Sequence, residues 1–433
     1  MSNAIQSITS ALPSLGKARL LINSADDVVI VAAVRSPLTR AKKGGLKDTL
    51  QDDLLKAVFQ EVVKRGKVDP SLIGDVVVGN VLPPGGGATV SRMAQLAAGI
   101  PHSVPLVTLN RQCSSGLQAV NNIANAIKAG DIDIGIGAGV ESMTSNYGGG
   151  VMPAAFSDDV LSNKEAADCL IPMGITSENV AKQYGISRDE QDDFAAASYA
   201  KAVAAQKAGL FKDETVPMKV KWIDPKTEET KEIIVDSDDG IRPTSREQLG
   251  KLRPAFAKDG STHAGNASQV TDGAAAVLLA RRSTAQKLGL PILGKYVAFA
   301  AVGVPPNVMG IGPAFAIPAV LAKAGITKDD VDFWEINEAF ASQAVMSIKT
   351  VGIPFENVNL NGGAIAFGHP LGATGARQIA TALSIAKQTG KKVFVTSMCI
   401  GTVQHTEYEP TLDVSWSNVG LGVRIALAPP SGG

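Results

Sequence analysis

The chain has few of the residues that build disulfide or metal sites. Its 433 residues include three cysteines and four histidines, and the cysteines stand far apart with no CxxC spacing. A disulfide framework needs several cysteine pairs, and a zinc site needs a cluster of Cys and His side chains. The composition therefore argues against both, and it predicts an intracellular protein with reduced thiols and no metal.

An excess of charge and a long apolar run are also missing. The chain has 41 basic and 41 acidic residues, so no bulk electrostatic field attracts nucleic acid or an anionic membrane. No stretch approaches the roughly 18 apolar residues that a membrane-spanning helix requires. What is present, 45% hydrophobic residues and 44 Gly, is typical of a soluble α/β enzyme of two or three domains.

Short β-prone runs ended by Gly, Pro or Asn alternate with helical stretches, which predicts an α/β fold with a parallel sheet covered on both faces. In the first part of the chain we expect strands over 27–37, 73–84, 104–110 and 131–142, and a helix over 116–130. In the second part we expect strands over 294–306 and 391–398, a strand entering a helix over 331–341, and helices over 317–326 and 375–390. The stretch 358–363 leads through a glycine-rich loop to the last of these helices.

The two series follow the same order, which predicts a duplicated α/β unit. Leu109-Asn110 and Leu360-Asn361 mark equivalent points, each just before a loop and a helix. Between the series the sequence changes character and contains a charged stretch, 216–236, that reads as an exposed hairpin. The predicted organisation is a flexible segment 1–27, a first half 28–143 plus 271–293, an inserted domain 144–270, a second half 294–402 and a tail 403–433.

Cys113 lies where a predicted strand gives way to a helix, in LNRQCSSGLQAV. Ser114, Ser115 and Gly116 open that helix, whose first N–H groups and dipole favour an anion and therefore a thiolate. Small neighbours also allow a carbonyl group to approach the sulfur. A cysteine is often only a packed core residue, but this position favours a nucleophile.

His369 lies in a loop with five glycines, NLNGGAIAFGHPLGATGAR. Glycine backbone suits close approach to a ligand, and the loop leads into another helix at the carboxyl edge of the sheet, where sites are commonly found. A phosphate cradle is disfavoured because neither GxxxxGK[ST] nor GxGxxG is present. A lone histidine is usually structural, so the functional interpretation of His369 depends on this glycine-rich loop.

Two further groups follow predicted strands. Asn337 and Glu338 stand at a strand-to-helix junction, where Asn337 is either a helix cap or a group that orients water in a polar pocket. Cys399 follows the strand over 391–398, beside Gly401. A nucleophilic thiolate, an imidazole and a second thiol together suit acyl transfer with carbon–carbon bond chemistry.

These residues resemble the thiolases, most closely 3-ketoacyl-CoA thiolases of the peroxisomal kind, from about residue 28 to residue 402. The resemblance is carried, in thiolase order, by NRQCSSGLQAV, GVESMT, AGNASQVTDGAAAVLLARRS, GVPPNVMGIGPAFAIP, EINEAFA, NGGAIAFGHPLGATGAR and SMCIG. It implies duplicated βαβαβαββ halves in a layered αβαβα arrangement with an inserted loop domain. It also implies CoA and a 3-ketoacyl-CoA as substrates, no metal or prosthetic group, and a homodimer or a tetramer.

The resemblance implies a mechanism. Cys113 attacks the 3-keto carbonyl, His369 takes its proton, and Cys399 protonates the departing acetyl-CoA enolate. One oxyanion site uses His369 and a water held by Asn337, and the other uses backbone N–H groups of Cys113 and Gly401.

Three further residues are implied as contacts of the CoA substrate, namely Ser268 in GNASQ, Met173 and Arg253. Short-chain acetoacetyl-CoA thiolases have His directly before the Met-Gly pair, where this chain has Pro172. The loss of that polar group predicts a roomier pocket for longer acyl chains.

The sequence departs from thiolases after CIGT. Val403 and Gln404 stand where thiolases have glycine, and the tail replaces the family's last strand. Either the β-prone stretch 419–429 re-enters that place in the sheet, or the tail reflects a reading-frame artefact. In the second case the site could be damaged, which leaves a catalytically impaired acyl-CoA-binding protein as an alternative to a thiolase.

The first 25 residues carry five Ser, two basic residues and no acid, and are either a disordered tail or an organelle address. The Arg and His of a typical peroxisomal address are missing. A peroxisomal location is therefore expected from the body of the sequence, with a mitochondrial or cytosolic one as alternatives. Acetoacetyl-CoA thiolase is a further alternative activity, and a ketoacyl synthase is disfavoured because synthases lack the second cysteine.

Overall fold

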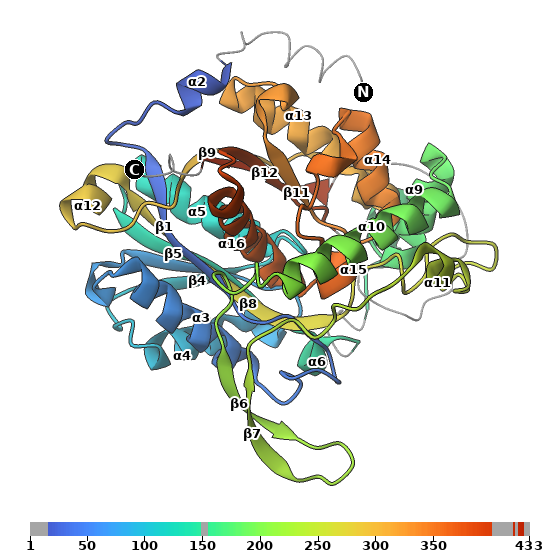
Figure 1. The fold of residues 1–433 in the computed structure, drawn as a ribbon, viewed down its shortest axis with the longest axis horizontal. Coiled ribbons are helices and arrows are strands. Elements are labelled where there is room, and N and C mark those ends of the chain that lie inside the picture. Colours follow the sequence, from blue (N-terminus) through green and yellow to red (C-terminus); the bar gives the residue numbers. More distant parts are fainter. Residues whose placement is uncertain (1–15, 149–154, 401–418, 421–422, 428–433) are drawn as a thin grey trace.

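Two similar halves pack against each other around a central pair of helices (Figure 1). The computed structural model describes residues 16–148, 155–400, 419–420 and 423–427. The elements of the first half are β1 (Val28–Arg35), β2 (Thr39–Arg40), α3 (Gln51–Gly66), η1 (Pro70–Leu72), β3 (Asp75–Gly79), η2 (Pro84–Gly87), α4 (Ala88–Ala97), β4 (Leu106–Leu109), α5 (Ser115–Ala129), β5 (Ile134–Ser142), β8 (Thr271–Arg281) and α12 (Arg282–Lys287).

The second half repeats this succession. Its elements are β9 (Gly294–Ala300), β10 (Gly303–Val304), η3 (Pro306–Ile311), α13 (Pro313–Ala324), η4 (Lys328–Asp330), β11 (Phe333–Ile336), α14 (Ala341–Val351), η5 (Phe355–Asn357), α15 (Ala364–Phe367), α16 (Leu371–Thr389), β12 (Val393–Ser397), β13 (Val419–Gly420) and β14 (Val423–Leu427).

Strand order demonstrates the duplication. In the first half the order is β4-β3-β5-β8-β1, and in the second it is β11-β12-β14-β9, with Val358 bridging Trp334 of β11 in the place of the outermost strand. If the five main strands of each half are numbered 1 to 5 in chain order, both halves have the spatial order 3-2-4-5-1. The predicted repeat is therefore confirmed. The sheet is mixed rather than parallel, because β8 and β14 run antiparallel to both of their neighbours.

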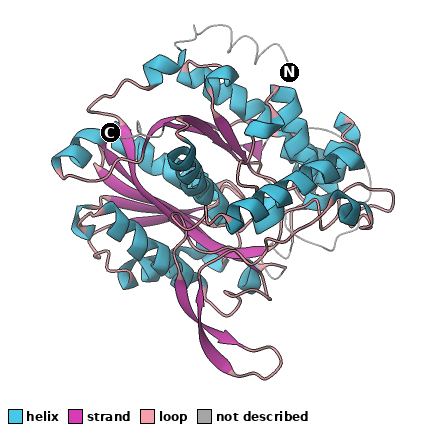
Figure 2. Ribbon diagram, viewed as in Figure 1, coloured by secondary structure: helices cyan, strands magenta, loops and turns pink. Residues whose placement is uncertain are grey.

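The layers follow from which residues share a core. One buried cluster joins apolar residues of both halves of the sheet to the helices α5 and α16 between them, including Val120, Val277, Ile379 and Phe394. A second cluster packs α3 on the outside of the first half, and a third packs α13 and α14 on the outside of the second. Figure 2 shows helices outside and between the curled strands. Strands β1 and β9 pair and link the two halves.

The described residues between β5 and β8 form separate helices and a hairpin. These elements are α6 (Met143–Asn146), α7 (Asp158–Ser162), α8 (Lys164–Asp168), α9 (Met173–Tyr184), α10 (Arg188–Lys207), β6 (Met218–Ile223), β7 (Thr230–Val235) and α11 (Arg246–Gly250). Strands β6 and β7 pair and project from the body (Figure 1), as the hairpin prediction requires. Helix α10 packs against α14 and α15. The division into domains stays a prediction.

The segment predicted to be a flexible region over 1–27 is partly ordered. Residues Gly16–Leu20 form the helix α2, and the Lys17 ammonium lies 2.5 Å from a carboxylate oxygen of Asp332. Leu20 is buried against the outer core of the second half. An ion pair and an apolar contact therefore join residues 16–20 to the second half.

The tail supplies the last strand of the second half, whose presence the sequence left undecided. Strand β14 lies between β12 and β9 and pairs with both, which is the place that β8 holds in the first half. Of the two alternatives, re-entry into the sheet is the one observed. Among the described residues, no helix is long and apolar enough to cross a membrane.

Candidate active site

The site forms where α5 and α16 begin. A Cβ atom on Gly116 would lie 2.5 Å from the carbonyl oxygen of Gly372, and one on Gly375 would lie 2.4 Å from the amide nitrogen of Leu117. Only glycine permits so close an approach at these positions. The glycines of CSSG and GATG therefore let the two helices cross at their first turns, which brings the loops before them together.

Cys113 occupies the turn directly before α5. The residue before it, Gln112, has a φ of 48°, in the left-handed region that costs a non-glycine residue energy. Ser115 stabilises the turn, because its hydroxyl donates to the carbonyl of Gln112 at 2.6 Å and accepts from the amide of Arg111 at 2.9 Å. Cys113 is 6% exposed and lines a cavity. The sharp turn fixes the direction of the thiol.

His369 precedes α16 and is fixed from several sides. Gly368 has a φ of 110°, and a Cβ atom there would lie 2.2 Å from the hydroxyl of Thr271. The backbone N–H of His369 donates to that hydroxyl at 2.8 Å. The ring contacts Thr374 through Nδ1 at 2.6 Å and Asn337 through Nε2 at 3.3 Å.

The electrostatic surroundings keep His369 neutral. Burial, reinforced by the nearby Arg377 guanidinium, lowers the pKa of His369 to about 3. Arg377 is itself buried and pairs with Glu335 at 3.1 Å. The imidazole is therefore unprotonated near neutral pH and can accept a proton.

Asn337 points into the site rather than capping a helix. Helix α14 begins at Ala341 with Phe340 in the cap position, so the cap interpretation of Asn337 is wrong. Its side-chain nitrogen lies 3.3 Å from Nε2 of His369 and 4.0 Å from Sγ of Cys399, and its buried oxygen has no protein hydrogen-bond partner. This amide joins the imidazole to the second thiol.

Glu338 serves a different purpose from its neighbour. Its carboxylate accepts hydrogen bonds from Ser198, Asn359 and the amide of Ile365. A Cβ atom on Gly363 would lie 2.3 Å from that carboxylate. Glu338 therefore ties down the loop that leads to His369.

Cys399 follows β12 and is fully buried. Burial, with a contribution from the nearby Cys113 sulfur, raises the pKa of the Cys399 thiol well above its ordinary value. The thiol therefore carries its proton at neutral pH. Such a group is prepared to donate a proton, as an acid must be.

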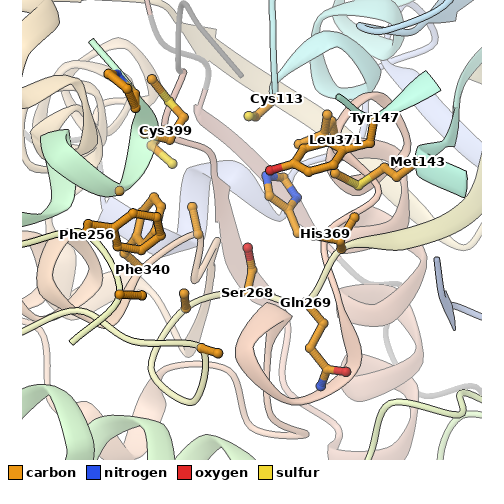
Figure 3. A pocket seen from close by; sticks show the side chains of 18 of the residues that line it. Cys113, Met143, Tyr147, Phe256, Ser268, Gln269, Phe340, His369, Leu371 and Cys399 are labelled. Carbon is orange, nitrogen blue, oxygen red and sulfur yellow. The ribbon is translucent and has the colours of Figure 1, made fainter. Parts of the chain in front are cut away.

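The three predicted catalytic side chains line one cavity of about 520 Å³. Figure 3 shows the two sulfurs and the imidazole around the same space. Ser268 and Met173 also line it, whereas Arg253 is exposed and lies outside the lining. Gly401 lies outside the described residues. The remaining walls are largely apolar and include Tyr147, Phe256, Met309, Phe340 and Leu371.

Sequence reasoning missed the side chains that hold His369. Thr374 stands only five positions after His369, directly before the predicted helix. This short spacing was a usable signal for its contact with the imidazole. Thr271 opens β8 and is distant in sequence, so nothing local indicated its contact with the backbone of His369. No cluster of His, Cys, Asp or Glu suited to a metal occurs in the part of the chain that the structure describes.

Comparison with known proteins identifies the family. A family model described as "Thiolase, N-terminal domain" matches residues 28–283, and one described as "Thiolase, C-terminal domain" matches residues 290–408. The chain belongs to the thiolase family. Among curated thiolases, a peroxisomal 3-ketoacyl-CoA thiolase of Yarrowia lipolytica (strain CLIB 122 / E 150) is 60% identical over 392 residues, which are 90% of this chain and 94% of that protein. The human peroxisomal 3-ketoacyl-CoA thiolase is 55% identical over 381 residues, 88% of this chain and 89% of that protein.

Solved thiolase structures agree with this fold. The dimeric peroxisomal thiolase of Saccharomyces cerevisiae superposes with a TM-score of 0.85 at 50% identity, covering 95% of this chain and 100% of that chain. Another structure of the peroxisomal 3-ketoacyl-CoA thiolase of that yeast, described as five-layered A-B-A-B-A with two core domains of identical topology, has a TM-score of 0.75 at 45% identity, with the same coverage. The predicted layered, duplicated α/β fold is confirmed.

Proposed function

We propose that this thiolase cleaves 3-ketoacyl-CoA with CoA, producing acetyl-CoA and a shortened acyl-CoA in the β-oxidation of fatty acids. The observation that carries the proposal is the shared cavity, because Cys113, His369 and Cys399 all line it. The high identity to 3-ketoacyl-CoA thiolases over most of the chain supports the choice of substrate.

In the first step the acyl chain is transferred to the enzyme. His369 Nε2 takes the proton of the Cys113 thiol, and the sulfur attacks C3 of the 3-ketoacyl-CoA. The tetrahedral oxyanion collapses, the C2–C3 bond breaks and its electron pair passes to C2. Cys399 gives its proton to C2, so acetyl-CoA leaves and Cys399 becomes a thiolate.

In the second step a new CoA releases the acyl chain. The Cys399 thiolate takes the proton of the CoA thiol, which attacks the acyl group on Cys113. The bond from the acyl carbon to Cys113 breaks, and the Cys113 sulfur regains its proton from His369. Each group thus returns to its starting protonation state, and a difficult carbon–carbon cleavage is divided into two easier transfers.

Two donor sets stabilise the oxyanions of these steps. His369 and a water held by Asn337 form one set, and the unpartnered side-chain oxygen of Asn337 supports a water at that place. The backbone N–H groups of Cys113 and Gly401 form the other. Preorganised donors of this kind each contribute about 3–4 kcal/mol.

The substrate is held by the walls of the cavity. Ser268 and Met173 contact the CoA arm, and the apolar walls receive an acyl chain longer than that of acetoacetyl-CoA, as Pro172 in the lining also suggests. Arg253 is assigned to the nucleotide end of CoA outside the cavity. CoA acts as a substrate, and the chemistry derived above uses only side chains and backbone of this chain.

The protein is a homodimer located in the peroxisome. Curated relatives are named as peroxisomal, and a similar solved structure is described as dimeric. Strand β4 is the outermost strand of the first half, with Val107 50% exposed, and nearby Met93 and Leu96 are also exposed. An open strand edge with apolar neighbours suits pairing with a second copy.

The test is turnover of the purified full chain. With a medium-chain 3-ketoacyl-CoA and CoA, we expect loss of the enolate absorbance and formation of acetyl-CoA and the shortened acyl-CoA in equal amounts. Binding of acyl-CoA without turnover would instead identify an impaired thiolase. Cleavage of acetoacetyl-CoA alone would identify a short-chain enzyme.

A further inference from the structure

The hydroxyl of Thr374 makes the shortest side-chain contact to His369. Its Oγ1 lies 2.6 Å from Nδ1 of the imidazole, and both side chains are buried. Thr374 lies one turn inside α16, which is itself buried along most of its length and pinned by the contact of Gly375 with Leu117. The hydroxyl is therefore held at a fixed position relative to the ring.

The other ring nitrogen faces a donor. The side-chain nitrogen of Asn337 lies 3.3 Å from Nε2 of His369 and also reaches Sγ of Cys399. An amide nitrogen can only donate, and this contact therefore points to Nε2 as the accepting nitrogen. A neutral imidazole with an accepting Nε2 carries its hydrogen on Nδ1, and the group that can accept this hydrogen is the Thr374 hydroxyl.

We propose that Thr374 is a positioning residue that sets the tautomer of His369, so that Nε2 presents its lone pair to the Cys113 thiol. When His369 takes the proton of Cys113, the hydrogen bond from Nδ1 to Thr374 becomes charge-assisted and stronger. This matters because burial, the nearby Arg377 and the start of α16 all disfavour a cationic ring at this place. The inference rests on the proposed roles of Cys113 and His369.

The experiment compares Thr374→Val, which keeps the shape but removes the hydroxyl, with Thr374→Ser, which keeps the hydroxyl. The readout is the rate of Cys113 alkylation by iodoacetamide across pH 5 to 10. We expect Thr374→Val to slow alkylation at neutral pH by roughly 10- to 100-fold, the loss of one hydrogen bond to a charged group. We expect its pH midpoint to rise, and Thr374→Ser to restore both values.

A matched control uses the same helix. Thr389 stands at the exposed end of α16, where its hydroxyl donates to the carbonyl of Ile385, so Thr389→Val should leave the pH profile unchanged. Thermal unfolding identifies any variant that fails to fold. A Thr374→Val protein that folds and keeps the original pH profile would overturn the proposal.

Nitrogen NMR of the full protein labelled with ¹⁵N-histidine gives a second test that needs no variant at position 374. The chain has only four histidines, and a His369→Asn spectrum assigns the signal. We expect the hydrogen on Nδ1, and a hydrogen on Nε2 would contradict the inference. Should the wild-type protein show these signals but fail to cleave 3-ketoacyl-CoA, the proposed function would fail while the role of Thr374 would stand.

Discussion

The two halves place different chemistry at corresponding points of the same topology. The loop before the inner helix carries Cys113 in the first half and His369 in the second. Strand β3 is followed directly by Asn80, and its counterpart in the second half, β11, is followed directly by Asn337. Duplication fixes where side chains appear, and later divergence decides what they do.

The pair of asparagines illustrates the difference. Asn80 is buried and donates to the carbonyl of Gly86 at 3.0 Å, so it shapes the loop after β3. Asn337 instead reaches His369 and Cys399.

A similar contrast holds for Glu141 at the end of β5 and Cys399 after β12. Glu141 accepts hydrogen bonds from the amides of Val81, Leu82 and Gly372. These side chains of the first half therefore bind backbone groups, whereas those at corresponding points of the second half belong to the candidate active site.

The largest effect is expected at the nucleophile, the one position where the first half supplies a reacting side chain. Cys113→Ala should reduce turnover by roughly 10⁴-fold or more, because no other group forms the thioester. Mass spectrometry after incubation with 3-ketoacyl-CoA should detect no acyl-enzyme. Cys169→Ala, a half-buried cysteine outside the cavity lining, is the matched control and should retain the acyl adduct. An adduct of full strength in Cys113→Ala would disprove the assignment.

The fifth strands differ most in length, since β8 has eleven residues and β14 has five. Deleting residues 419–433 would open the edges of both β12 and β9, whose backbone groups pair with β14. We expect a loss of several kcal/mol, seen as a fall of roughly 5 °C in the melting temperature. Deleting only 428–433 keeps the strand and is the control. Equal melting temperatures for the two deletions would argue against pairing by β14.

Cys399→Ala separates the two proton transfers. Acylation of Cys113 does not need the second thiol, whereas protonation of the enolate does, so the variant should form some acyl-enzyme but turn over about 10²- to 10⁴-fold more slowly. Exchange of the α-protons of acetyl-CoA with deuterated water, followed by proton NMR, is the direct measurement. If exchange continued at the wild-type rate, Cys399 would not be the acid.

Matched alanine variants at Asn80 and Asn337 test the comparison of the halves directly. Asn337→Ala should lower kcat by about 10²- to 10³-fold with little change in melting temperature, because one oxyanion site loses its water. Asn80→Ala should lower the unfolding free energy by about 1–2 kcal/mol, because a buried hydrogen bond is lost, with kcat nearly unchanged. The opposite pattern would mean that the first half contributes more to catalysis than its contacts indicate.

The last expected effect is on stability alone and concerns its dependence on pH. Burial raises the pKa of Glu141 from its ordinary value of 4.5 to about 7, despite the three amide donors. A raised folded-state pKa means that the contribution to stability is complete below pH 4.5 and is lost as pH rises through 7. At about 1.4 kcal/mol per tenfold change in proton affinity, the loss is roughly 3 kcal/mol.

Glu141→Gln measures this contribution, because an amide keeps an acceptor oxygen but does not titrate. Urea unfolding at pH 5 and pH 8 should show the variant gaining stability relative to the wild type at the higher pH. A constant difference between the two proteins would show that Glu141 does not titrate in this range. Asp75→Asn, a partly buried carboxyl on the neighbouring strand β3, is a control with a smaller expected change.

Local patterns predicted much of the fold and the central residues of the site. Cys113, His369 and Cys399 each follow a strand or open a helix, which their neighbours in sequence reveal. The role of Asn337 stayed open because a polar residue at such a junction serves equally well as a cap, and only the start of α14 at Ala341 excluded the cap. The ion pair of Lys17 could not be predicted because its partner, Asp332, lies far along the chain.

The sequence alone determined the repeated succession of strands and helices and the motifs of the family, because periodicity, glycines and turn residues act on their immediate neighbours. The tertiary structure alone decided that Cys113, His369 and Cys399 line one cavity and that Thr271 holds the backbone of His369. It alone decided that β14 closes the second half. Such contacts join segments distant in the chain, and they form only when the helices cross and the sheet pairs.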